Sequence, residues 1–596
     1  MEMLLSGNEA VARGMYEHGG EFASAYPGTP STEILQTIAR FFKSDVYCEW
    51  SINEKVALEA AVGASYGGAR ALAAMKHVGV NIAADPLMTL SYTGVGAGLV
   101  LVSADDPSLH SSQNEQDNRC YGKFASIPVL EPSDSQESLD MVKTAFEMSE
   151  EFDTPVLFRM TTRVSHSKGL VKIGSGRKTV EHPGFEKNIA KYVMVPSNAA
   201  VRHKIVIERL EKLKAYAETT PLNKMEMNDR KVGIISGSVA YQYAREVMPN
   251  ASFLKLGLGY PLPMNKIMEF ARQVDRLFVV EELEPFYEEQ ILAAGIPCEG
   301  KKWFSNYMEQ SPDRVRDGFI EAGVLPKSAA PAKQVEEKVL PRPPVLCPGC
   351  PHRGVMMSLR KLGVYVTGDI GCYTLAALPP LETIDTCLCM GASISHAFGI
   401  EKAKKTKKKT VAIIGDSTFL HSGITALANV VYNKGTQTTI IVDNRITAMT
   451  GGQDHPGTSK TLMGEKTYAI DLIQLCKALG VEHVRTIDPY DQESTTAALK
   501  EEIAREAPSV VITTRPCMLF PSKIKVERAF HVLTAKCTAC GACFRIGCPA
   551  ISASPEKNEK GKPKSAIDPE LCTGCSLCYQ VCSFEAIEEN VQKGKQ

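Results

Sequence analysis

Eight cysteines near the C-terminal end form two groups whose spacing is typical of iron ligands. The first group reads C-x2-C-x2-C-x4-C-P and the second C-x2-C-x2-C-x3-C. In this pattern three closely spaced thiolates wrap one cubane, and its fourth ligand comes from the other group. The spacing therefore predicts two 4Fe-4S clusters with crossed ligands. The first set is Cys537, Cys540, Cys543 and Cys582, and the second is Cys572, Cys575, Cys578 and Cys548.

Zinc is the alternative occupant of paired C-x2-C motifs. Triplets of cysteines with a proline-flanked fourth ligand fit iron and sulfur better than zinc. The pattern departs from the usual one in an extra residue before Cys548 and in Ser583, which stands where a proline is usual. Either change can alter hydrogen bonding to sulfur, and hence the reduction potential, without removing a ligand.

A second chemical site is indicated where two apolar strands end in polar residues. The run 411–415 ends in Gly415 and is followed by Asp416 and Ser417, and the run 438–442 is followed by Asp443 and Asn444. A divalent ion carrying a diphosphate prefers hard oxygen ligands in octahedral geometry. Asp416, Asn444 and the carbonyl of Ile446 meet that need, with Gly415 and Ser417 in the cofactor-binding turn. A helix expected at 423–431 would point its N-terminus at the phosphates; the alternative is an ordinary turn.

This Gly-Asp and distant Asn spacing is similar to the thiamine diphosphate motif. A thiamine unit joined to a two-cluster tail resembles the 2-oxoacid:ferredoxin oxidoreductases. The resemblance is carried by Y-P-G-T-P-S at 26–31, N-E-K-V-A at 53–57 continuing to G-A-S at 63–65, C-P-G-C-P-H-R at 347–353, D-I-G-C at 369–372 and C-M-G-A-S at 389–393. These stretches lie in both halves of the chain, so the match is specific.

The resemblance implies catalytic roles for three residues. Thiamine enzymes need a carboxylate against the aminopyrimidine ring, and Glu54 is expected to supply it, with Glu59 as the competitor. Thr29 matches a position near the 2-oxo acid group of the substrate, although threonine between glycine and proline is common in plain turns. Arg119 could pair with the substrate carboxylate, and Lys76 could face the cofactor; surface exposure or a structural role is the alternative for each.

The resemblance also implies a third cluster. Cys347, Cys350, Cys372 and Cys517 stand at positions like those that hold a cluster beside thiamine in relatives. The alternative is a C-P-G-C turn with two unrelated buried thiols.

The activity implied by the resemblance is oxidative decarboxylation of an aryl 2-oxo acid, indole-3-pyruvate first. Thiamine diphosphate and Mg2+ would be the cofactors, coenzyme A the acyl acceptor and ferredoxin the electron acceptor. A smaller β subunit and an α2β2 assembly are expected. Two alternatives stay open: a relative that uses pyruvate, 2-oxoglutarate or branched-chain 2-oxo acids, and an electron-transfer subunit without thiamine chemistry.

These residues must be positioned by an α/β fold, in which thiamine diphosphate-binding domains with doubly wound parallel sheets precede a two-cluster ferredoxin domain. Short apolar strands such as 71–75, 99–102, 232–235 and 277–280 alternate with helical segments. The expected boundaries are 1–165 for a pyrimidine-type thiamine-binding domain, 166–230 for a connector with a helix near 202–217, 231–325 for a small α/β domain like the C-terminal domain of transketolase, 326–344 for a linker, 345–520 for a diphosphate-type thiamine-binding domain and 530–590 for the ferredoxin domain.

Composition narrows the possible partners and the compartment. The 596 residues carry a formal net charge of −1, so no global field attracts nucleic acid or an anionic membrane. No apolar run approaches membrane-spanning length, and the first residues do not form a secretory signal. Clustered cysteines with ligand spacing favour a reducing compartment. A cytoplasmic location is therefore expected, without nucleic-acid or membrane partners.

Overall fold

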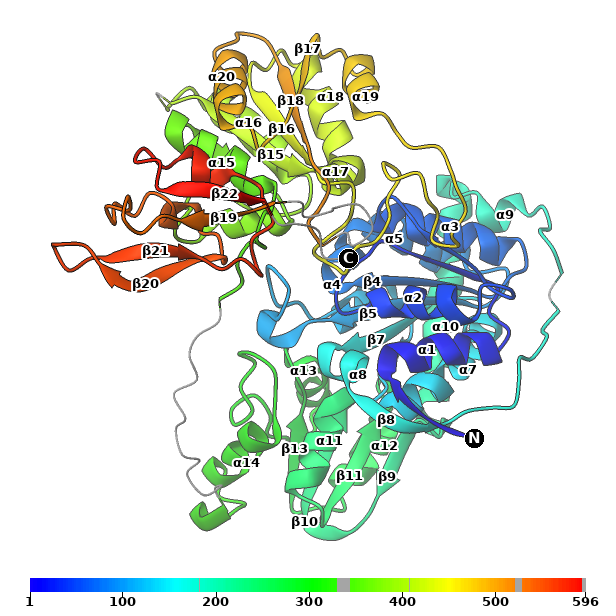
Figure 1. Cartoon of the computed structure of the whole chain (residues 1–596). Helices are drawn as coiled ribbons and strands as arrows, with labels where there is room; N and C mark the ends of the chain where they lie inside the picture. The colour runs from blue at the N-terminus through cyan, green and yellow to red at the C-terminus, as the bar shows by residue number, and fades with distance from the viewer. Residues whose placement is uncertain (182, 330–342, 407, 520–527, 592–596) are drawn as a thin grey trace. The chain divides into compact units, whose positions relative to one another are not determined.

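The computed structural model describes residues 1–591 except 182, 330–342, 407 and 520–527 (Figure 1). It divides into two compact units, Met1–Glu337 and Lys338–Gln596. The boundary falls inside the segment 326–344 that the sequence predicts as a linker, most of which lies outside the described residues. Among the described helices, none has the length and apolar character that crossing a membrane requires.

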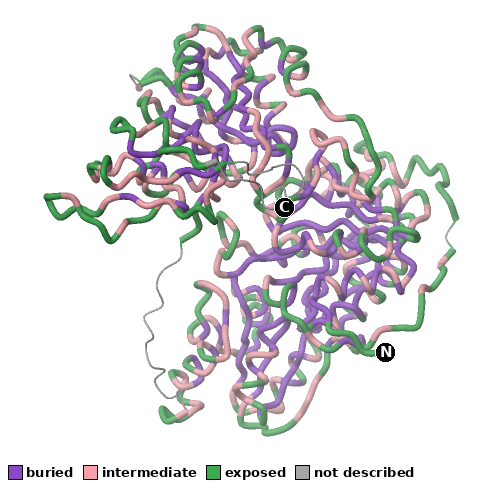
Figure 2. The backbone as a smooth tube through the Cα atoms, viewed as in Figure 1, coloured by how far each residue is buried: buried purple, intermediate pink, exposed green. Residues whose placement is uncertain are grey.

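A seven-stranded sheet forms the centre of the first unit. Its strand order is β12-β6-β7-β5-β4-β2-β3, and every pairing except that of β12 with β6 is parallel. The bounds are β2 Phe22–Ala25, β3 Tyr47–Trp50, β4 Ala71–Lys76, β5 Leu99–Asp105, β6 Val129–Leu130, β7 Val156–Thr161 and β12 Leu258–Tyr260. Strands β4, β5 and β7 are buried along their whole length (Figure 2). Their nearly continuous apolar sequence is what a parallel strand covered on both faces requires.

Helices alternate with these strands along the chain, and some of them begin at side-chain caps. In α1 the side chain of Ser6 accepts the N–H of Glu9, whose carboxylate accepts the N–H of Ser6 in return. Asn53 caps α3 by accepting the N–H of Val56, so Glu54 is the first residue of that helix. The helices are α1 Gly7–Glu17, α2 Thr32–Phe41, α3 Glu54–Tyr66, α4 His77–Ile82, α5 Ala84–Thr93, α6 Arg119–Ala125, α7 Ser135–Phe152 and α8 Thr162–His166.

The segment 166–230, expected as a connector, is built into the fold at several points. Strand β8 Lys168–Lys172 pairs antiparallel with β1 Glu2–Ser6, and the short helix α9 Ile189–Tyr192 follows. The expected helix runs further at both ends, as α10 Pro196–Thr219. It is anchored by two buried arginines: Arg202 donates to Tyr92 O at 2.6 Å and Arg209 to Ser91 O at 2.6 Å.

A second sheet in the first unit has the order β13-β10-β11-β9. Its strands are β9 Asn223–Glu226, β10 Asp229–Gly237, β11 Ala251–Leu256 and β13 Arg276–Val280, and the helices around it are α11 Ser238–Val247, α12 Met264–Ala271, α13 Phe286–Ala293 and α14 Pro312–Glu321. Strand β9 begins before residue 231, and β12 leaves this region to join the seven-stranded sheet. One hydrophobic cluster contains Leu101 from the first sheet and Ile235 from the second, so the two sheets share a core.

The second unit contains a five-stranded parallel sheet in the order β14-β15-β16-β18-β17. The strands are β14 Tyr365–Thr367, β15 Thr410–Gly415, β16 Thr438–Asp443, β17 His483–Ile487 and β18 Ser509–Thr514, and the helices are α15 His352–Leu362, α16 Ala392–Ala403, α17 Asp416–Thr418, α18 Ile424–Tyr432, α19 Leu472–Ala478 and α20 Gln492–Ile503. Alternate residues of β15 belong to two separate hydrophobic clusters, Ile413 to one and Ile414 to the other. The sheet is therefore covered on both faces, as expected for a doubly wound domain.

The cysteine-rich tail folds around its own small core. Strand β19 Arg528–Val532 pairs antiparallel with β22 Ile587–Val591, and β20 Ile551–Lys557 pairs antiparallel with β21 Pro563–Ile567 (Figure 1). The short helix α21 Leu577–Gln580 lies between β21 and β22 in sequence. Phe530, Cys543 and Cys578 belong to one hydrophobic cluster, against which several of the other cysteines pack.

Candidate functional site

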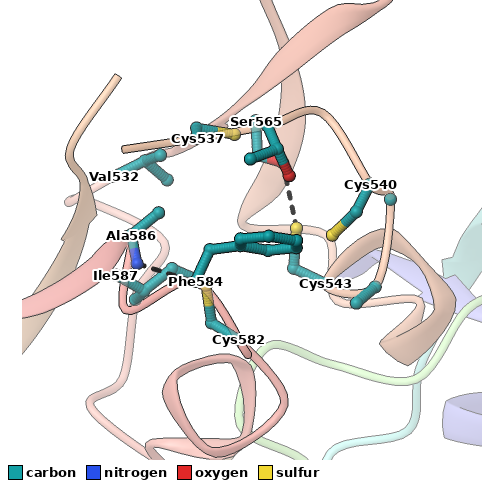
Figure 3. A pocket seen from close by; sticks show the side chains of 12 residues that line it. Val532, Cys537, Cys540, Cys543, Ser565, Cys582, Phe584, Ala586 and Ile587 are labelled. Carbon is teal, nitrogen blue, oxygen red and sulfur yellow. Dashed lines mark hydrogen bonds between the residues drawn. The ribbon is translucent and has the colours of Figure 1, made fainter. Parts of the chain in front are cut away.

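Two cavities in the tail divide the eight cysteines into the crossed sets. The first lies among Cys537, Cys540, Cys543 and Cys582 (Figure 3). The second lies among Cys548, Cys572, Cys575 and Cys578. The fold thus brings three cysteines of one group to the fourth of the other around each cavity, which is the arrangement that the spacing predicts.

Hydrogen bonds reach sulfur in both cavities. The hydroxyl oxygen of Ser565 lies 2.9 Å from Cys543 Sγ, and the N–H of Ala586 donates to Cys582 Sγ at 3.3 Å (Figure 3). In the second cavity the N–H of Phe530 donates to Cys572 Sγ at 3.4 Å. Donors of this kind stabilise the negative charge on thiolate ligands and tune the reduction potential of a cluster.

The donor sets fit clusters of iron and sulfur. Within the described ranges, no three or more His, Cys, Asp or Glu side chains converge on a single ion; the thiols surround a space instead. Burial raises the pKa of the Cys575 thiol to about 11, so an adjacent cation is needed to hold it as thiolate at neutral pH. A polynuclear cluster supplies both the charge and the volume.

A third cavity lies among Cys347, Cys350, Cys372 and Cys517. Burial raises the pKa of the Cys350 thiol to about 12 and that of Cys372 to about 11. The same cavity is lined by Asn444, one of the predicted magnesium ligands. The fold therefore places four thiols from three separate stretches beside the strand-end site.

The strand-end site has Asp416 at its centre. Its Oδ1 accepts the N–H of Ser417 at 2.9 Å, and its Oδ2 accepts the N–H of Arg445 at 2.8 Å. His455 Nε2 lies 3.2 Å from Oδ2. Burial opposes ionisation of this carboxyl, but the hydrogen bond and charge of His455 outweigh it, so the pKa of Asp416 lies below its usual value. Asp416 is thus held as a carboxylate, the form that a magnesium ion binds.

The other two predicted magnesium ligands come from the loop after β16. Asn444 is buried and its Oδ1 accepts the N–H of Ile446 at 3.3 Å, while the residue between them bonds to Asp416. Asp416, Asn444 and Ile446 are therefore gathered at one edge of the sheet. The hard oxygen donors that they offer, a carboxylate, an amide and a carbonyl, fit Mg2+ with a diphosphate.

The helix after β15 begins earlier than the sequence suggested. We expected it at 423–431, but helical structure starts with α17 at Asp416, passes through a π-helical turn, Phe419–Gly423, and continues as α18. Gly415 ends the strand in an extended conformation, so the turn into the helix needs no further residues. The first turn of the helix consequently begins at Asp416 itself, and the N–H of Ser417 in that turn donates to the Asp416 carboxylate.

Asp369 is a structural residue of the site that we did not predict from the sequence. Its Oδ1 accepts the N–H of Gly391 at 2.8 Å and its Oδ2 that of Ser393 at 3.0 Å, so this buried carboxylate caps the N-terminus of α16. It ties the D-I-G-C stretch to C-M-G-A-S. We did not predict His455 either, because the loop that contains it has no periodic pattern in sequence. Its contact with Asp416 in the structure is what identifies it as a residue of the site.

In the first unit, Glu54 and its competitor Glu59 have different surroundings. Glu54 is 5 % exposed at the start of α3. A Cβ on Gly79 of α4 would lie only 2.8 Å from Glu54 Oε1, so the glycine leaves room for the carboxylate. Glu59 is on the surface and pairs with Lys55. Of the two, Glu54 has the burial that a carboxylate facing an aminopyrimidine ring requires.

Thr29 lies in a turn that packs against Lys76. The Thr29 carbonyl accepts the hydroxyl of Ser111 at 3.3 Å, and Lys76 Nζ donates to Ser111 O at 2.5 Å. Gly28 is in close contact with the Lys76 side chain, since an added Cβ there would lie 3.0 Å from Lys76 Cβ. Burial lowers the pKa of Lys76 to about 8, against the opposing charge of Asp106. Thr29 and the partly desolvated amine of Lys76 thus lie on neighbouring segments.

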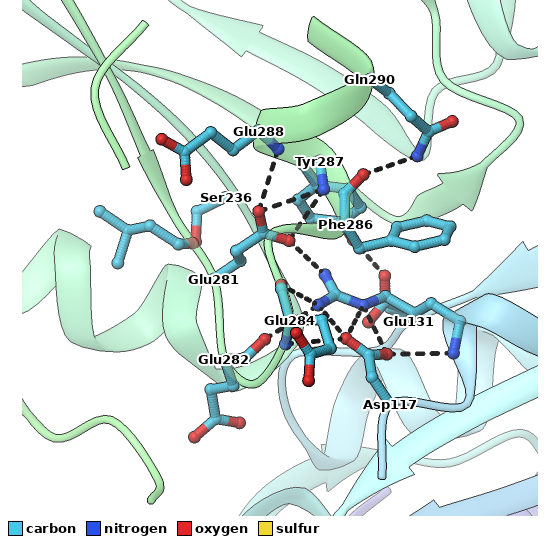
Figure 4. Close-up of polar contacts among 12 residues, drawn as sticks. Asp117, Glu131, Ser236, Glu281, Glu282, Glu284, Phe286, Tyr287, Glu288 and Gln290 are labelled. Carbon is cyan, nitrogen blue, oxygen red and sulfur yellow. Dashed lines mark hydrogen bonds and ion pairs between the residues drawn. The ribbon is translucent and has the colours of Figure 1, made fainter. Parts of the chain in front are cut away.

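Arg119, expected to pair with a substrate carboxylate, pairs instead with two internal carboxylates, those of Asp117 and Glu281, which are labelled in Figure 4. It is 1 % exposed. Its guanidinium pairs with Asp117 at 2.5 Å and Glu281 at 2.7 Å, and donates to the carbonyls of Glu282 at 2.9 Å and Glu284 at 3.2 Å. Through these contacts the guanidinium of Arg119 joins β13 and α13 to the start of α6. They favour a structural role, and the substrate role of Arg119 stays an expectation.

The same network continues through Tyr287, whose hydroxyl donates to Glu131. The N–H of Tyr287 donates to Glu281 Oε2 at 3.0 Å (Figure 4). Arg159 Nη1 donates to Glu131 Oε1 at 2.6 Å. These pairs are buried and hydrogen-bonded, which is the condition under which charges are tolerated in a core.

Comparison with protein families finds matches to three parts of the chain. The family described as pyruvate flavodoxin/ferredoxin oxidoreductase, thiamine diphosphate-binding, matches residues 13–229. The C-terminal TPP-binding domain of thiamine pyrophosphate enzymes matches 369–513, and the 4Fe-4S dicluster domain matches 536–586. The last two matches contain the strand-end site and all eight cysteines of the tail.

Curated relatives align with the whole chain. Indolepyruvate oxidoreductase subunit IorA of Pyrococcus horikoshii is 41 % identical over 100 % of this chain and 98 % of its own length. The protein of the same name from Archaeoglobus fulgidus is 40 % identical over 98 % of this chain and 97 % of its own. The 2-oxoglutarate synthase subunit KorA of Methanothermobacter thermautotrophicus is 25 % identical over 50 % of this chain and 92 % of its own.

Proposed function

Because the chain belongs to the indolepyruvate oxidoreductase IorA family, we propose that it oxidatively decarboxylates aryl 2-oxo acids, with indole-3-pyruvate as the substrate. Thiamine diphosphate and iron–sulfur clusters are its cofactors, and its chemistry is ferredoxin-dependent oxidation of a 2-oxo acid. Coenzyme A takes the acyl group. The balance is one 2-oxo acid, one coenzyme A and two oxidised ferredoxins giving acyl-coenzyme A, carbon dioxide, one proton and two reduced ferredoxins.

The observation that carries the proposal is the position of the third cavity. Cys347, Cys350, Cys372 and Cys517 surround a space that Asn444 also lines. Thiamine diphosphate, when bound, supplies the electron sink that lets carbon dioxide leave the 2-oxo acid. A third 4Fe-4S cluster in this cavity would take the electrons one at a time beside the diphosphate site, as the reaction requires.

The residues of the chain have separate tasks in this scheme. Asp416, Asn444 and the Ile446 carbonyl would hold Mg2+ and through it the diphosphate. Glu54 would donate or accept a proton at the aminopyrimidine ring. Thr29 would lie near the 2-oxo acid group of the substrate. His455 keeps Asp416 oriented and ionised.

A second, smaller subunit completes the enzyme in our proposal, in an α2β2 assembly. The relatives that align over the whole length are named as subunits, which supports a partner chain. Full-length identity of about 40 % to the indolepyruvate enzymes, against 25 % over half of this chain to the 2-oxoglutarate enzyme, supports an aryl substrate over 2-oxoglutarate.

The test uses the complete enzyme purified without oxygen. Reduction of ferredoxin or a viologen dye is followed with indolepyruvate, phenylpyruvate, pyruvate and 2-oxoglutarate, and bound thiamine diphosphate and iron are quantified. We expect the highest kcat/KM with an aryl substrate, and about twelve irons per chain rather than about eight, from four irons in each cubane. Asp416→Ala should abolish thiamine binding, whereas the cap variant Asp471→Ala on α19 should retain it. Thiamine binding that survives Asp416→Ala would overturn the site.

A further inference from the structure

The tail has a surface hollow between its first cysteine loop and the β20–β21 hairpin. Both Cys537 and Cys540 line it, and so do four lysines of the hairpin: Lys557, Lys560, Lys562 and Lys564. Glu559 is the one acidic residue among the described residues of this lining. The hollow therefore combines two ligands of a predicted cluster with a local excess of positive charge.

The lysines are available to a partner to different degrees. Lys557, Lys560 and Lys562 are exposed. Lys564 is half-buried, donates to Thr534 O at 2.8 Å and lies 3.6 Å from Glu556. The chain as a whole has a formal net charge of −1, so this positive patch is a local feature, of the kind that steers an oppositely charged partner to one place.

The cavities are ordered along the second unit. The second cavity is lined by Gly349 and Arg353, which flank Cys350 of the third cavity. Arg353 Nη2 donates to Cys347 O at 3.2 Å and its Nη1 to Gly547 O at 2.7 Å, so one side chain bridges the two cysteine regions. The route from the diphosphate site thus leads through the second cavity before it reaches the first.

Among the eight cysteines of the two tail cavities, the one that is exposed belongs to the first cavity. Cys540 is exposed, whereas Cys548, Cys572 and Cys575 are half-buried and Cys578 is buried. An electron that leaves through an exposed cysteine ligand crosses the least protein on its way to an external acceptor. Cys537 and Cys540 therefore line both the first cavity and the lysine hollow.

We propose that this lysine hollow docks a small acidic electron-carrier protein of the ferredoxin class, which takes electrons from the cluster at Cys537, Cys540, Cys543 and Cys582. This inference rests on the proposed function for the source of the electrons, but the docking itself depends only on the geometry and charge of the tail. Each docking event removes one electron, which reduces the carrier and reoxidises the cluster.

A second basic segment serves as the matched control. The stretch 402–409 is rich in lysine, and Lys404, Lys405 and Lys408 are exposed there. None of the residues that line the three cysteine cavities comes from this stretch within the described part of the chain. Its charge resembles that of the hollow, but it offers no cluster ligand.

The experiment compares two triple charge reversals in the complete enzyme: K557E/K560E/K562E in the hollow and K404E/K405E/K408E in the control. Binding of an acidic ferredoxin is measured by calorimetry at an ionic strength of about 0.02 M and again at about 0.3 M. For the hollow variant we expect Kd to rise about tenfold or more at low salt, with a weaker salt dependence than in the unmodified enzyme. The control should stay within about twofold of the unmodified enzyme.

Two further measurements separate docking from folding and catalysis. Iron content and viologen reduction at saturating dye should be unchanged in the hollow variant, and the milder K560Q/K562Q, confined to the hairpin turn, should give a smaller rise in Kd. Unchanged ferredoxin binding in the hollow variant, or a loss confined to the control, would overturn the proposal. Because calorimetry needs no 2-oxo acid turnover, failure of the proposed function would show separately, as absence of dye reduction by the unmodified enzyme.

Discussion

Gly79 and Glu54 are in such close contact that a single added carbon would displace the carboxylate. A Cβ on Gly79 would lie 2.7 Å from Glu54 Cγ and 2.8 Å from its Oε1. The glycine is inside α4, where alanine is otherwise favoured by about 1 kcal/mol. Its presence is therefore explained by the space that the neighbouring side chain needs.

Gly79→Ala should consequently lower activity without lowering thermal stability much. We expect kcat to fall at least about tenfold, because the added Cβ would displace the Glu54 carboxylate, and proton transfer depends strongly on the position of the carboxylate. Gly63→Ala on α3 is the matched control, since nothing lies within 4 Å of its added Cβ. Equal kcat values for the two variants would contradict a positioned role for Glu54.

Removing the carboxylate itself should have a larger effect. Glu54→Gln keeps the size of the side chain but cannot hold the proton, so we expect kcat to fall by about 10² to 10⁴ while bound thiamine diphosphate stays near its normal content. Glu59→Gln changes an exposed residue paired with Lys55 and should leave kcat within about twofold. Steady-state kinetics and cofactor quantification check both, and the prediction fails if Glu59→Gln is the more damaging variant.

Ser565 should tune the cluster of the first cavity. Its hydroxyl lies 2.9 Å from Cys543 Sγ, and a hydrogen bond to a charged sulfur stabilises the reduced cluster. Losing about 1.5 kcal/mol of that stabilisation corresponds to about 60 mV for a one-electron couple. A redox titration followed by electron paramagnetic resonance should show a more negative potential, by some tens of millivolts up to about 60 mV, in Ser565→Ala. Ser552→Ala, an exposed serine of β20, is the control and should leave the potential unchanged.

Local spacing predicted the parts of the site that are local in sequence. The cysteine triplets, the Gly415-Asp416 turn and Asn444 each follow from a short pattern, and the structure gathers them as cavities and a strand-end cluster. The central strands were predicted equally well, because β4, β5 and β15 are continuous apolar runs. A buried parallel strand carries this signal in its own residues.

Features that depend on distant pairing were not predictable in this way. Arg119 lies 162 residues from Glu281 in the chain, and no periodicity marks the two as partners. The pairing of β12 with β6 in the seven-stranded sheet could not be predicted either, because a strand of three residues is too short to show a pattern. The lysine-rich segment 166–230 looked like a connector, because arginines occupy two of the five buried positions of α10 and interrupt its apolar stripe. Both arginines bond to backbone carbonyls.

Arg119→Met should destabilise the first unit. The change leaves Asp117 and Glu281 buried without their cation, and breaking a buried pair in this way costs about 3 to 5 kcal/mol. Arg163→Met breaks an exposed pair with Glu309 and should cost at most about 1 kcal/mol. Thermal unfolding of both variants measures the difference. A stable Arg119→Met protein with a raised KM for the 2-oxo acid would restore the substrate role that we expected from the sequence.

Glu282 should make the stability of the first unit depend on pH. Burial raises the pKa of this carboxyl to about 7, against the opposing charge of Arg159; its usual value is 4.5. Between these values the folded state holds a proton that the unfolded state has released, so the free energy of unfolding falls as pH rises from about 4.5 to about 7 and stays lower above that. The difference amounts to about 3 kcal/mol.

Glu282→Gln removes this titration while keeping the shape of the side chain. Relative to the unmodified protein, the variant should therefore be more stable at pH 8 than at pH 5, by a difference of about 3 kcal/mol. Denaturation midpoints at the two pH values provide the measurement. Glu284→Gln, which changes a neighbouring exposed residue, controls for the loss of one negative charge near Glu282. A pH-dependent difference in stability of the same size in that variant would show that Glu282 is not the cause.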